Sequence, residues 1–502
     1  MTLTRRSVLQ GLLASSALSA LTGAARADST PFTRDGVIAM ARDLARHSYQ
    51  PMPEVPQDWR DLSYEQYKSI WFRHDRALWH GTDVPYDVDF FHPGLYFPRP
   101  VQISTVENGQ ATLVPFDLNN FDRTDQVPDL STDGEMGFSG FRLRTELDQP
   151  GIRNEFAVFQ GASYFRAIGI GEIYGLSARG LALHTADPKG EEFPDFTRFW
   201  LETPRPGQRN IVVHALLDSP SVTGAYRFDI TPGTDCVMEV QATLFPRVDL
   251  THVGLGPLTS MFMYDRTNRN RFDDFRPAVH DSDGLLIRNG AGEVIWRPLA
   301  NPRHLQISAF GDENPRGFGL MQRARKLSDF DDLEALYHRR PGLWVEPHGD
   351  WGRGAVTLVE IPTDEEIYDN IVAYWRPAAP MPAGQQVDLA YRLTWGDQAP
   401  GQGALPRVID TASGLSMSGN RVMVIEYEPH ELLAGAPEDY TLRISSPHVE
   451  TTTGVLQRNP ETGGMRLVFG FDPGDHGLIE LRAQLRCDGA PASEVWLYRW
   501  TA

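Results

Sequence analysis

From about residue 90 to the C-terminus, short runs of β-branched and aromatic residues alternate with Pro, Gly, Asn and Asp. This pattern is typical of strands joined by tight turns. The 45 Gly and 37 Pro residues are scattered without a period, which favours many short strands over long helices. We therefore predict an all-β fold. The predicted strands include residues 91–97, 156–160, 211–215, 226–230, 305–308, 355–359, 387–395, 422–427, 440–444, 465–471 and 479–485.

The succession of predicted strands is interrupted at residues 397–406, a stretch rich in Gly, Gln, Pro and Ala. Such a composition is typical of a linker between domains. Residues 28–396 are long enough for a large β-sandwich. Residues 407–502 have the size and strand spacing of a small sandwich of the immunoglobulin type. We predict one domain on each side of the linker.

Helical periodicity is confined to a few segments. Residues 36–47 and 64–79 place apolar or aromatic residues at helical spacing, so each is predicted to be a helix. Residues 331–337 fit either a short helix or a strand. Helices are therefore expected to be a minor part of the fold.

The first 27 residues have the order of an export signal. Arg5 and Arg6 precede a weakly apolar stretch at residues 11–25, and an Ala-x-Ala sequence ends at Ala27. The arginine pair favours the twin-arginine route, with an ordinary secretory signal as the alternative. We predict cleavage near Ala27 and a mature protein in the periplasm.

Cysteine content agrees with export of a folded protein. The chain has only two cysteines, Cys236 and Cys487, which are 251 positions apart. Two such distant cysteines cannot make a disulfide framework, and we expect both to be unpaired, with a single bridge as the minority alternative.

Charge and motif content exclude several functions. The chain has 47 Lys and Arg against 66 Asp and Glu, a formal net charge of −19, so a nucleic acid is not an expected partner. The sequence contains no dinucleotide-binding glycine motif, no phosphate-binding loop and no Gly-x-Ser-x-Gly elbow. The 14 histidines do not group at zinc-binding spacings. We therefore expect neither a cofactor nor a metal.

Carboxylates lie close to aromatic residues in several segments of the second half of the chain. A pyranose is bound by stacking on an aromatic ring and by hydrogen bonds from its hydroxyls, and glycosidic cleavage requires two carboxyl groups. The composition thus permits carbohydrate chemistry, although acids in turns and tryptophans in strands commonly serve the fold alone. The segments are residues 276–285, 292–299, 333–341, 349–352 and 365–377.

The order of these segments resembles the periplasmic glucan biosynthesis proteins of the G and D type. The sequences that carry the resemblance are HDSDGL, WRPLANP, LQISAF, GFGLMQR, DLEALYHRRP and DNIVAYWRP. The resemblance covers the chain from Asp28 onward, and the paired arginines favour the D branch. It implies a large N-terminal β-sandwich similar to galactose mutarotase, followed by an immunoglobulin-like domain.

The resemblance also implies an activity and a site. Members act on osmoregulated periplasmic glucans, and some hydrolyse β-1,2-glucan with inversion. Carried onto this sequence, Asp369 would be the general acid, and Asp281 the general base acting through a proton relay. Glu366, Tyr337 and Arg340 would line the cleft. Burial or a nearby acid such as Glu366 would raise the pKa of Asp369. His280 or Arg340 would help to keep Asp281 ionised.

Other functions and partners stay open at this stage. A transglycosylase that cyclises the glucan through an α-1,6 bond, and a non-catalytic scaffold for a membrane glucosyltransferase, are the alternatives to a hydrolase. β-1,2-Glucan chains are the expected ligands, and a homodimer or a membrane glucosyltransferase is an open partner.

The aromatic residues in these segments are expected to divide between the core and the site. Trp351, in a predicted loop between Asp350 and Gly352, is the best candidate for stacking on a sugar. Trp296, Trp344 and Trp375 lie in predicted strands and are expected in the core.

Overall fold

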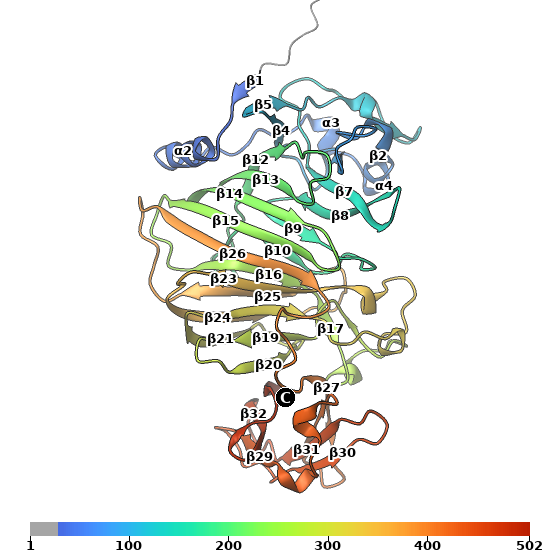
Figure 1. Ribbon diagram of the computed structural model, residues 1–502, viewed down its shortest axis with the longest axis vertical. Coiled ribbons are helices and arrows are strands. Elements are labelled where there is room, and N and C mark those ends of the chain that lie inside the picture. The colour runs from blue at the N-terminus through green and yellow to red at the C-terminus, as the bar shows by residue number, and fades with distance from the viewer. Residues whose placement is uncertain (1–28) are drawn as a thin grey trace, which may run out of the picture.

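The computed structural model describes residues 29–502, so the predicted signal lies outside the described residues. The described chain forms a column, with the N-terminal helices at one end and residues after 407 at the other (Figure 1). None of the helices in this part of the chain is long and apolar enough to cross a membrane. The α-helices are α2 (Arg34–Ala45), α3 (Gln57–Arg60) and α4 (Tyr64–Lys68).

One sheet of sixteen strands runs along most of the column. Its pairs are antiparallel except for β4 with β12 and β20 with β34. In sheet order, the strands are β1 (Ser29–Pro31), β5 (Gln110–Leu113), β4 (Gln102–Glu107), β12 (Asp195–Glu202), β13 (Ile211–Asp218), β14 (Val222–Thr231), β15 (Cys236–Pro246), β26 (Val387–Gly396), β23 (Gly342–His348), β22 (Gly317–Met321), β19 (Gly284–Arg288), β20 (Val294–Pro298), β34 (Val495–Thr501), β32 (Leu478–Cys487) and β29 (Thr441–Ser445), with β33 (Ala490–Pro491) beside β32.

A second sheet of ten strands packs against the first and completes the large sandwich. All of its strand pairs are antiparallel. In sheet order, the strands are β21 (Gln306–Glu313), β24 (Arg353–Glu360), β25 (Ile371–Pro377), β16 (Val253–Ser260), β10 (Ser177–Arg179), β9 (Tyr164–Ala167), β8 (Ile152–Gln160), β7 (Gly140–Gln149) and β3 (Asp87–Phe91), with β11 (Ala182–Leu183) beside β16.

The main core lies between these two sheets and follows from period-two patterning of the strands. On β14, Phe228 and Ile230 point into this core, and Phe165 of β9 meets Phe228 with ring centroids 5.0 Å apart. Ala225 faces the opposite side, where α2 covers the large sheet through Val37. The large sheet is thus apolar on both faces over this region, which explains the need for a helix there.

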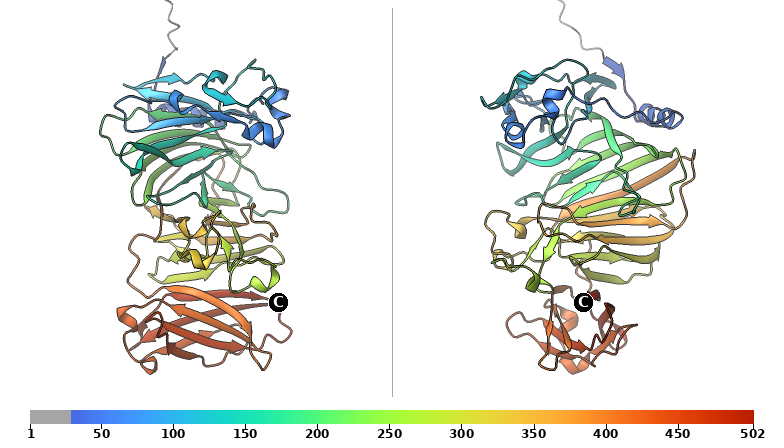
Figure 2. Two further views of the ribbon diagram at one scale, coloured as in Figure 1. Left: turned by 90° about the vertical axis from the view of Figure 1, so that its right-hand side faces the viewer. Right: turned by 180° about the vertical axis from the view of Figure 1, so that it is seen from behind.

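The C-terminal strands form a second, smaller sandwich. A four-stranded sheet packs on the end of the long sheet and encloses a core of its own. Figure 2 shows both sandwiches from two further sides, with the smaller one at the end of the column. The strands of this sheet, in order, are β27 (Val408–Leu415), β28 (Arg421–Tyr427), β31 (Met465–Phe471) and β30 (Val455–Arg458).

The two sandwiches are joined by more than the predicted linker. β20 pairs in parallel with β34, so the long sheet continues from one sandwich into the other. Beside this junction, Arg323 forms a buried ion pair with Glu494 at 2.8 Å, and its guanidinium lies 3.6 Å from the ring centroid of Trp296. Residues 397–406 connect β26 to β27 without a strand of their own.

Small elements complete the architecture. Two short antiparallel strand pairs are β17 (Phe262–Tyr264) with β18 (Val279–His280), and β2 (Ile70–Phe72) with β6 (Phe121–Arg123). The 3-10 helices are η1 (His74–Arg76), η2 (Leu118–Asn120), η3 (Arg269–Arg271), η4 (Leu327–Asp329), η5 (Tyr337–Arg339), η6 (Glu431–Leu433) and η7 (Pro437–Asp439).

The all-β prediction is confirmed, while three local predictions need correction. The helix predicted at 64–79 ends after five residues, because the β-prone sequence at 70–72 pairs with β6 instead. The strand predicted at 91–97 ends at Phe91, where the chain turns through Gly94 at φ 114°. Residues 331–336 form neither the helix nor the strand considered.

Other local expectations are met. The helix predicted at 36–47 is α2, which begins two residues earlier because Thr33 accepts a hydrogen bond from the amide of Gly36. Cys236 and Cys487 are both free.

Candidate active site

The outer face of the ten-stranded sheet carries a band of polar side chains. On β9, β10 and β16, polar residues alternate with the core positions, because period-two alternation turns them away from the core. The members of this band nearest the predicted catalytic residues are Tyr164 and Arg166 on β9, Arg179 on β10 and Thr259 on β16.

Asp281 lies just after β18 and is almost fully buried, with 4% of its surface exposed. Its amide donates to the carbonyl of Met261 at 2.8 Å, which fixes the backbone. Arg340 donates from Nη1 to Oδ1 of the carboxylate. Burial raises the pKa of Asp281 to about 6, against the lowering effect of Arg340. Asp281 is therefore mostly ionised at neutral pH.

Arg340 is held in a definite orientation, as expected from the proline that follows it. Its Nε and Nη2 donate to the carbonyl of Ala335 at 3.2 and 3.1 Å, and its guanidinium lies 4.4 Å from the ring centroid of Tyr337. Arg325 donates to the carbonyl of Arg340 at 2.7 Å. These contacts leave Nη1 free to bind Asp281.

Asp369 lies at the end of the loop between β24 and β25. The next residue, Asn370, anchors this loop: Oδ1 accepts from the amide of Phe262 at 2.8 Å, and Nδ2 donates to the carbonyls of Phe262 and Ile361 at 2.9 and 3.0 Å. Because Asn370 is 2% exposed, these bonds are shielded from water. The anchor fixes the position from which Asp369 reaches the polar band.

Water reaches the carboxyl of Asp369, yet protein surrounds it closely enough for burial to raise its pKa. A group with both properties lies in a depression of the surface. Arg166, Arg179, Arg340 and the Thr259 hydroxyl oppose this rise. Among the described residues, Asp369 makes no ion pair.

The two carboxyls belong to one electrostatic site. The charge of Asp369 is among the causes that raise the pKa of Asp281. Burial raises the pKa of both carboxyls, and of the two only Asp281 is in direct contact with a guanidinium. An ionised carboxylate beside a protonated one is the combination that general base and general acid require.

Glu366 and Tyr337 form a neighbouring cluster. The Tyr337 hydroxyl donates to Oε2 of Glu366 at 3.2 Å, and Nη1 of Arg276 lies 2.9 Å from the same oxygen. The sequence offered burial or a nearby acid such as Glu366 as the cause of a raised pKa of Asp369. Burial is the largest cause, whereas Glu366 is paired with Arg276.

His280 also differs from expectation. It was considered as a partner that holds Asp281 ionised, but its Nδ1 lies 3.0 Å from Oε1 of Gln322, and its ring stacks on Phe262. Burial lowers the pKa of His280 to about 3, so the ring is neutral. Of His280 and Arg340, only Arg340 therefore provides a positive charge that favours the ionised form of Asp281.

The tryptophans are distributed partly as expected. Trp296, Trp344 and Trp375 are 3%, 1% and 0% exposed, which confirms them as core residues. Trp351 is half-buried, and its ring meets Tyr391 edge-to-face at 5.9 Å. Among the described residues, no hydrogen bond joins Trp351 to either carboxyl, so its stacking role stays a prediction.

Sequence reasoning missed the polar neighbours contributed by earlier strands of the ten-stranded sheet. Tyr164, Arg166, Arg179 and Thr259 come from β9, β10 and β16. Their signal is an alternation of polar residues with buried ones such as Phe165 and Ala178. That alternation identifies an outer face, but it does not reveal which loops cover it.

Within residues 29–502, two groups of side chains have the geometry to hold a metal ion. One consists of His74, His80 and Asp87, and the other of His184, Asp187 and His252. Neither group was predicted from the sequence, because neither has the spacing of a zinc motif. Both lie apart in the chain from the two carboxyls that are predicted to be catalytic.

Comparison with known proteins identifies the family. A family profile described as "Periplasmic glucan biosynthesis protein, MdoG" matches residues 32–500. The chain belongs to this family. The family description places its members in the periplasm and in glucan biosynthesis.

Individual relatives are similar over nearly the whole chain. "Glucans biosynthesis protein G" of Vibrio cholerae serotype O1 is 48% identical over 480 residues, which cover 94% of this chain and 87% of the relative. The proteins of that name from Shewanella sp. strain MR-4 and Shewanella frigidimarina are each 47% identical, over 476 and 480 residues. These cover 94% and 95% of this chain, and 87% and 86% of the relatives. The D-branch assignment stays a prediction.

Proposed function

We propose that this protein hydrolyses β-1,2-glucan chains in the periplasm as an inverting endo-glycosidase. The observation that carries the proposal is the unequal treatment of two desolvated carboxyls. Asp281 is bound by Arg340, whereas Asp369 makes no ion pair among the described residues. This arrangement supports a base and an acid in one site.

The reaction uses each carboxyl once. Asp369 gives its proton to the glycosidic oxygen as the bond from that oxygen to the anomeric carbon breaks. Water attacks the opposite face of the sugar, and its proton passes through a relay to Asp281. Each cleavage consumes one water and leaves the new reducing end with inverted configuration.

The polar band supplies groups suited to a neutral sugar. Arg166, Arg179 and the Tyr164 hydroxyl lie around Asp369, and each can hydrogen-bond a glucose hydroxyl. The positive charges of Arg166 and Arg179 favour ionisation of nearby acids and so limit the rise in the pKa of Asp369. Sugar binding and pKa control would thus rest on the same side chains.

The test compares the wild type with Asp369→Asn on linear β-1,2-glucan, followed by mass spectrometry and optical rotation. The expected result is shorter linear products that gain one water per cleavage, an optical rotation that reports inversion, and loss of activity in the variant. Glu365→Gln, an exposed neighbour in the same loop, is the control and should keep activity.

Other outcomes have defined meanings. Cyclic products without added water would show transglycosylation instead of hydrolysis. No turnover by the wild type would favour a non-catalytic role as a glucan-binding scaffold. Full activity in Asp369→Asn would refute the acid assignment.

A further inference from the structure

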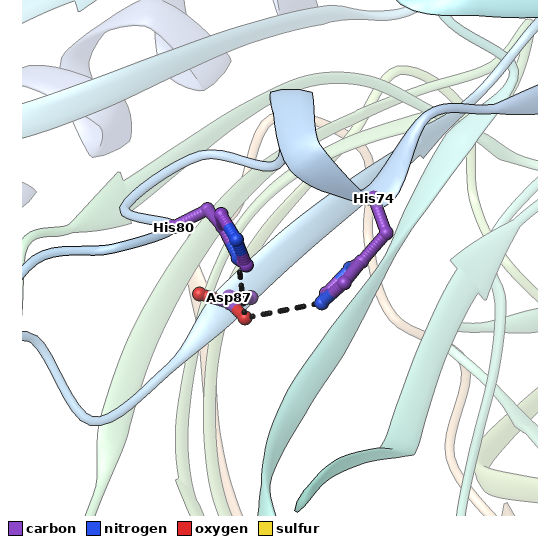
Figure 3. A group of neighbouring side chains, drawn as sticks. All are labelled: His74, His80 and Asp87. Carbon is purple, nitrogen blue, oxygen red and sulfur yellow. Dashed lines mark hydrogen bonds and ion pairs between the residues drawn. The ribbon is translucent and has the colours of Figure 1, made fainter.

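We propose that His74, His80 and Asp87 form a zinc site at the edge of the ten-stranded sheet. Figure 3 shows both imidazole rings directed at the same carboxylate. Nδ1 of His80 lies 3.4 Å from Oδ2 of Asp87, and Nε2 of His74 lies 3.6 Å from it. The ligand atoms of all three residues lie within 4.8 Å of one another.

These spacings fit a metal better than a direct hydrogen bond. In tetrahedral zinc sites the bonds to nitrogen and oxygen are about 2.0–2.2 Å, so neighbouring ligand atoms are about 3.3 Å apart. A charge-assisted hydrogen bond between imidazolium and carboxylate is instead about 2.7–2.9 Å long. The distances from the two imidazole nitrogens to Oδ2 of Asp87, 3.4 and 3.6 Å, are close to this separation of neighbouring ligand atoms.

A second layer of contacts orients the ligands. Nδ1 of His74 lies 3.2 Å from Oδ1 of Asp89, whose other oxygen accepts from Arg142 and Arg144 at 2.8 and 3.1 Å. A proton on Nδ1 of His74 leaves Nε2 with the lone pair that a metal needs. A carboxylate behind a ligating histidine is a recurring feature of zinc sites.

The backbone explains how the three residues meet. Leu78 and Val88 exchange two backbone hydrogen bonds, of 3.0 and 3.2 Å, which place the segment between the histidines over β3. Because Val88 points into the core, Asp87 points to the outer face. A metal here would staple the segment that carries His74 and His80 to the edge strand of the sheet.

Exposure leaves room for an ion and a water. The side chains of His74 and His80 are each 42% exposed, whereas that of Asp87 is 1% exposed beneath them. The fourth coordination position is therefore open to solvent. Arg153 binds the other oxygen of Asp87 and reduces its negative charge, so we expect weaker binding than at a site with four protein ligands.

The site is separate from the proposed catalytic carboxyls. β3 is three strand positions from β9 and five from β16, the strands that carry Arg166 and Thr259, or about 14 and 24 Å at the usual spacing of about 4.8 Å. Glucan hydrolysis is therefore not the readout for this proposal. Zinc content and zinc-dependent stability are measured instead.

The experiment uses purified protein that has been freed of metal with a chelator. Zinc is titrated by calorimetry, and bound zinc is counted by mass spectrometry after gel filtration. We expect one zinc per wild-type chain, with affinity reduced more than about 100-fold in His74→Gln and in His80→Gln, since even residues behind the ligands typically matter 10- to 100-fold. Cobalt(II) should give the visible absorption of a tetrahedral site.

His184→Gln is the matched control, since it removes a histidine from the second group of potential ligands. It should bind zinc as the wild type does. Circular dichroism and thermal melting without metal establish that each variant is folded, and zinc should raise the melting temperature of the wild type and the control alone. Absence of zinc binding, binding unchanged in His74→Gln and His80→Gln, or binding lost in His184→Gln would overturn the proposal.

Discussion

The guanidinium of Arg340 binds the carboxylate of Asp281 and at the same time lies over the ring of Tyr337. The arginine therefore acts on a buried acid whose pKa, about 6, is the balance of two opposing effects. Burial favours the protonated acid, and the guanidinium favours the carboxylate. Asp281 can serve as a base at neutral pH only while that contact is intact.

Replacing Arg340 should move the pH dependence of hydrolysis. In Arg340→Gln the pKa of Asp281 rises further above 6, so the acidic limb of kcat/KM should shift upward by about one pH unit or more. Activity at pH 6 should fall more than activity at pH 8. Initial rates on β-1,2-glucan between pH 4 and 9 measure the shift.

Arg339→Gln is the control for this shift. Arg339 is the adjacent arginine, and it donates to the carbonyl of Gly171 rather than to Asp281. The acidic limb of kcat/KM for Arg339→Gln should lie at the same pH as that of the wild type. An equal fall at every pH in Arg340→Gln would instead show that the arginine acts on substrate binding alone.

The acid assignment of Asp369 predicts a dependence on the leaving group. Asp369→Asn should lower kcat on β-1,2-glucan by about 10²- to 10⁴-fold, the usual contribution of a general acid. The loss should be much smaller on a β-1,2-linked oligosaccharide with a nitrophenyl group at the scissile bond, because nitrophenolate leaves without being protonated. Equal losses on both substrates would contradict the acid role.

The sequence predicts the strands of the sandwiches better than it predicts the surroundings of the site. Runs such as 226–230 are strands because their alternation matches a half-buried pleat, and this signal is local. The distribution of charge around Asp369 depends on Arg166 and Arg179, which come from strands about 200 residues earlier. Only the pairing order of the sheet brings them together, and a single sequence does not specify that order.

The same dependence on tertiary structure explains why the expectations for His280 and Glu366 needed correction. His280 and Glu366 lie close in sequence to Asp281 and Asp369, which made them reasonable electrostatic partners. In the structure, His280 contacts Gln322 and Glu366 is paired with Arg276. Both contacts depend on the tertiary structure. Proximity in sequence did not predict contact because the loops turn these side chains away from the carboxyls.

His280 should make the stability of the protein depend on pH. Its folded pKa, about 3, is below the unfolded value of about 6.5, so between these values the unfolded chain binds more protons. Stability is therefore lost as the pH falls from about 6.5 toward 3, by about 2 kcal/mol at pH 5 for this residue. In His280→Gln that contribution should vanish.

Urea unfolding of the wild type and His280→Gln at pH 7.5 and pH 5 tests this prediction. The variant is expected to lose less unfolding free energy than the wild type between the two pH values, whatever its absolute stability. His47→Gln, a change at an exposed histidine in the N-terminal segment, should leave the wild-type difference unchanged. Equal losses in wild type and His280→Gln would show that the buried ring does not govern this pH range.

The ion pair between Arg323 and Glu494 predicts that the two sandwiches unfold together. Glu494 accepts from both Nη1 and Nη2 of Arg323 at 2.8 Å and also from the amide of Val408, while the two paired side chains are only 3% and 2% exposed. Removing one partner leaves an uncompensated buried charge, which typically costs about 3–5 kcal/mol. Glu494→Gln should lower the melting temperature of the whole chain in one transition, because the sheet runs through the junction from β20 to β34.

The exposed pair of Arg60 and Glu54 gives the control for this prediction, since Glu54→Gln should cost at most about 1 kcal/mol. Calorimetry that resolves two separate transitions in the wild type would show that the continuous sheet does not couple the sandwiches.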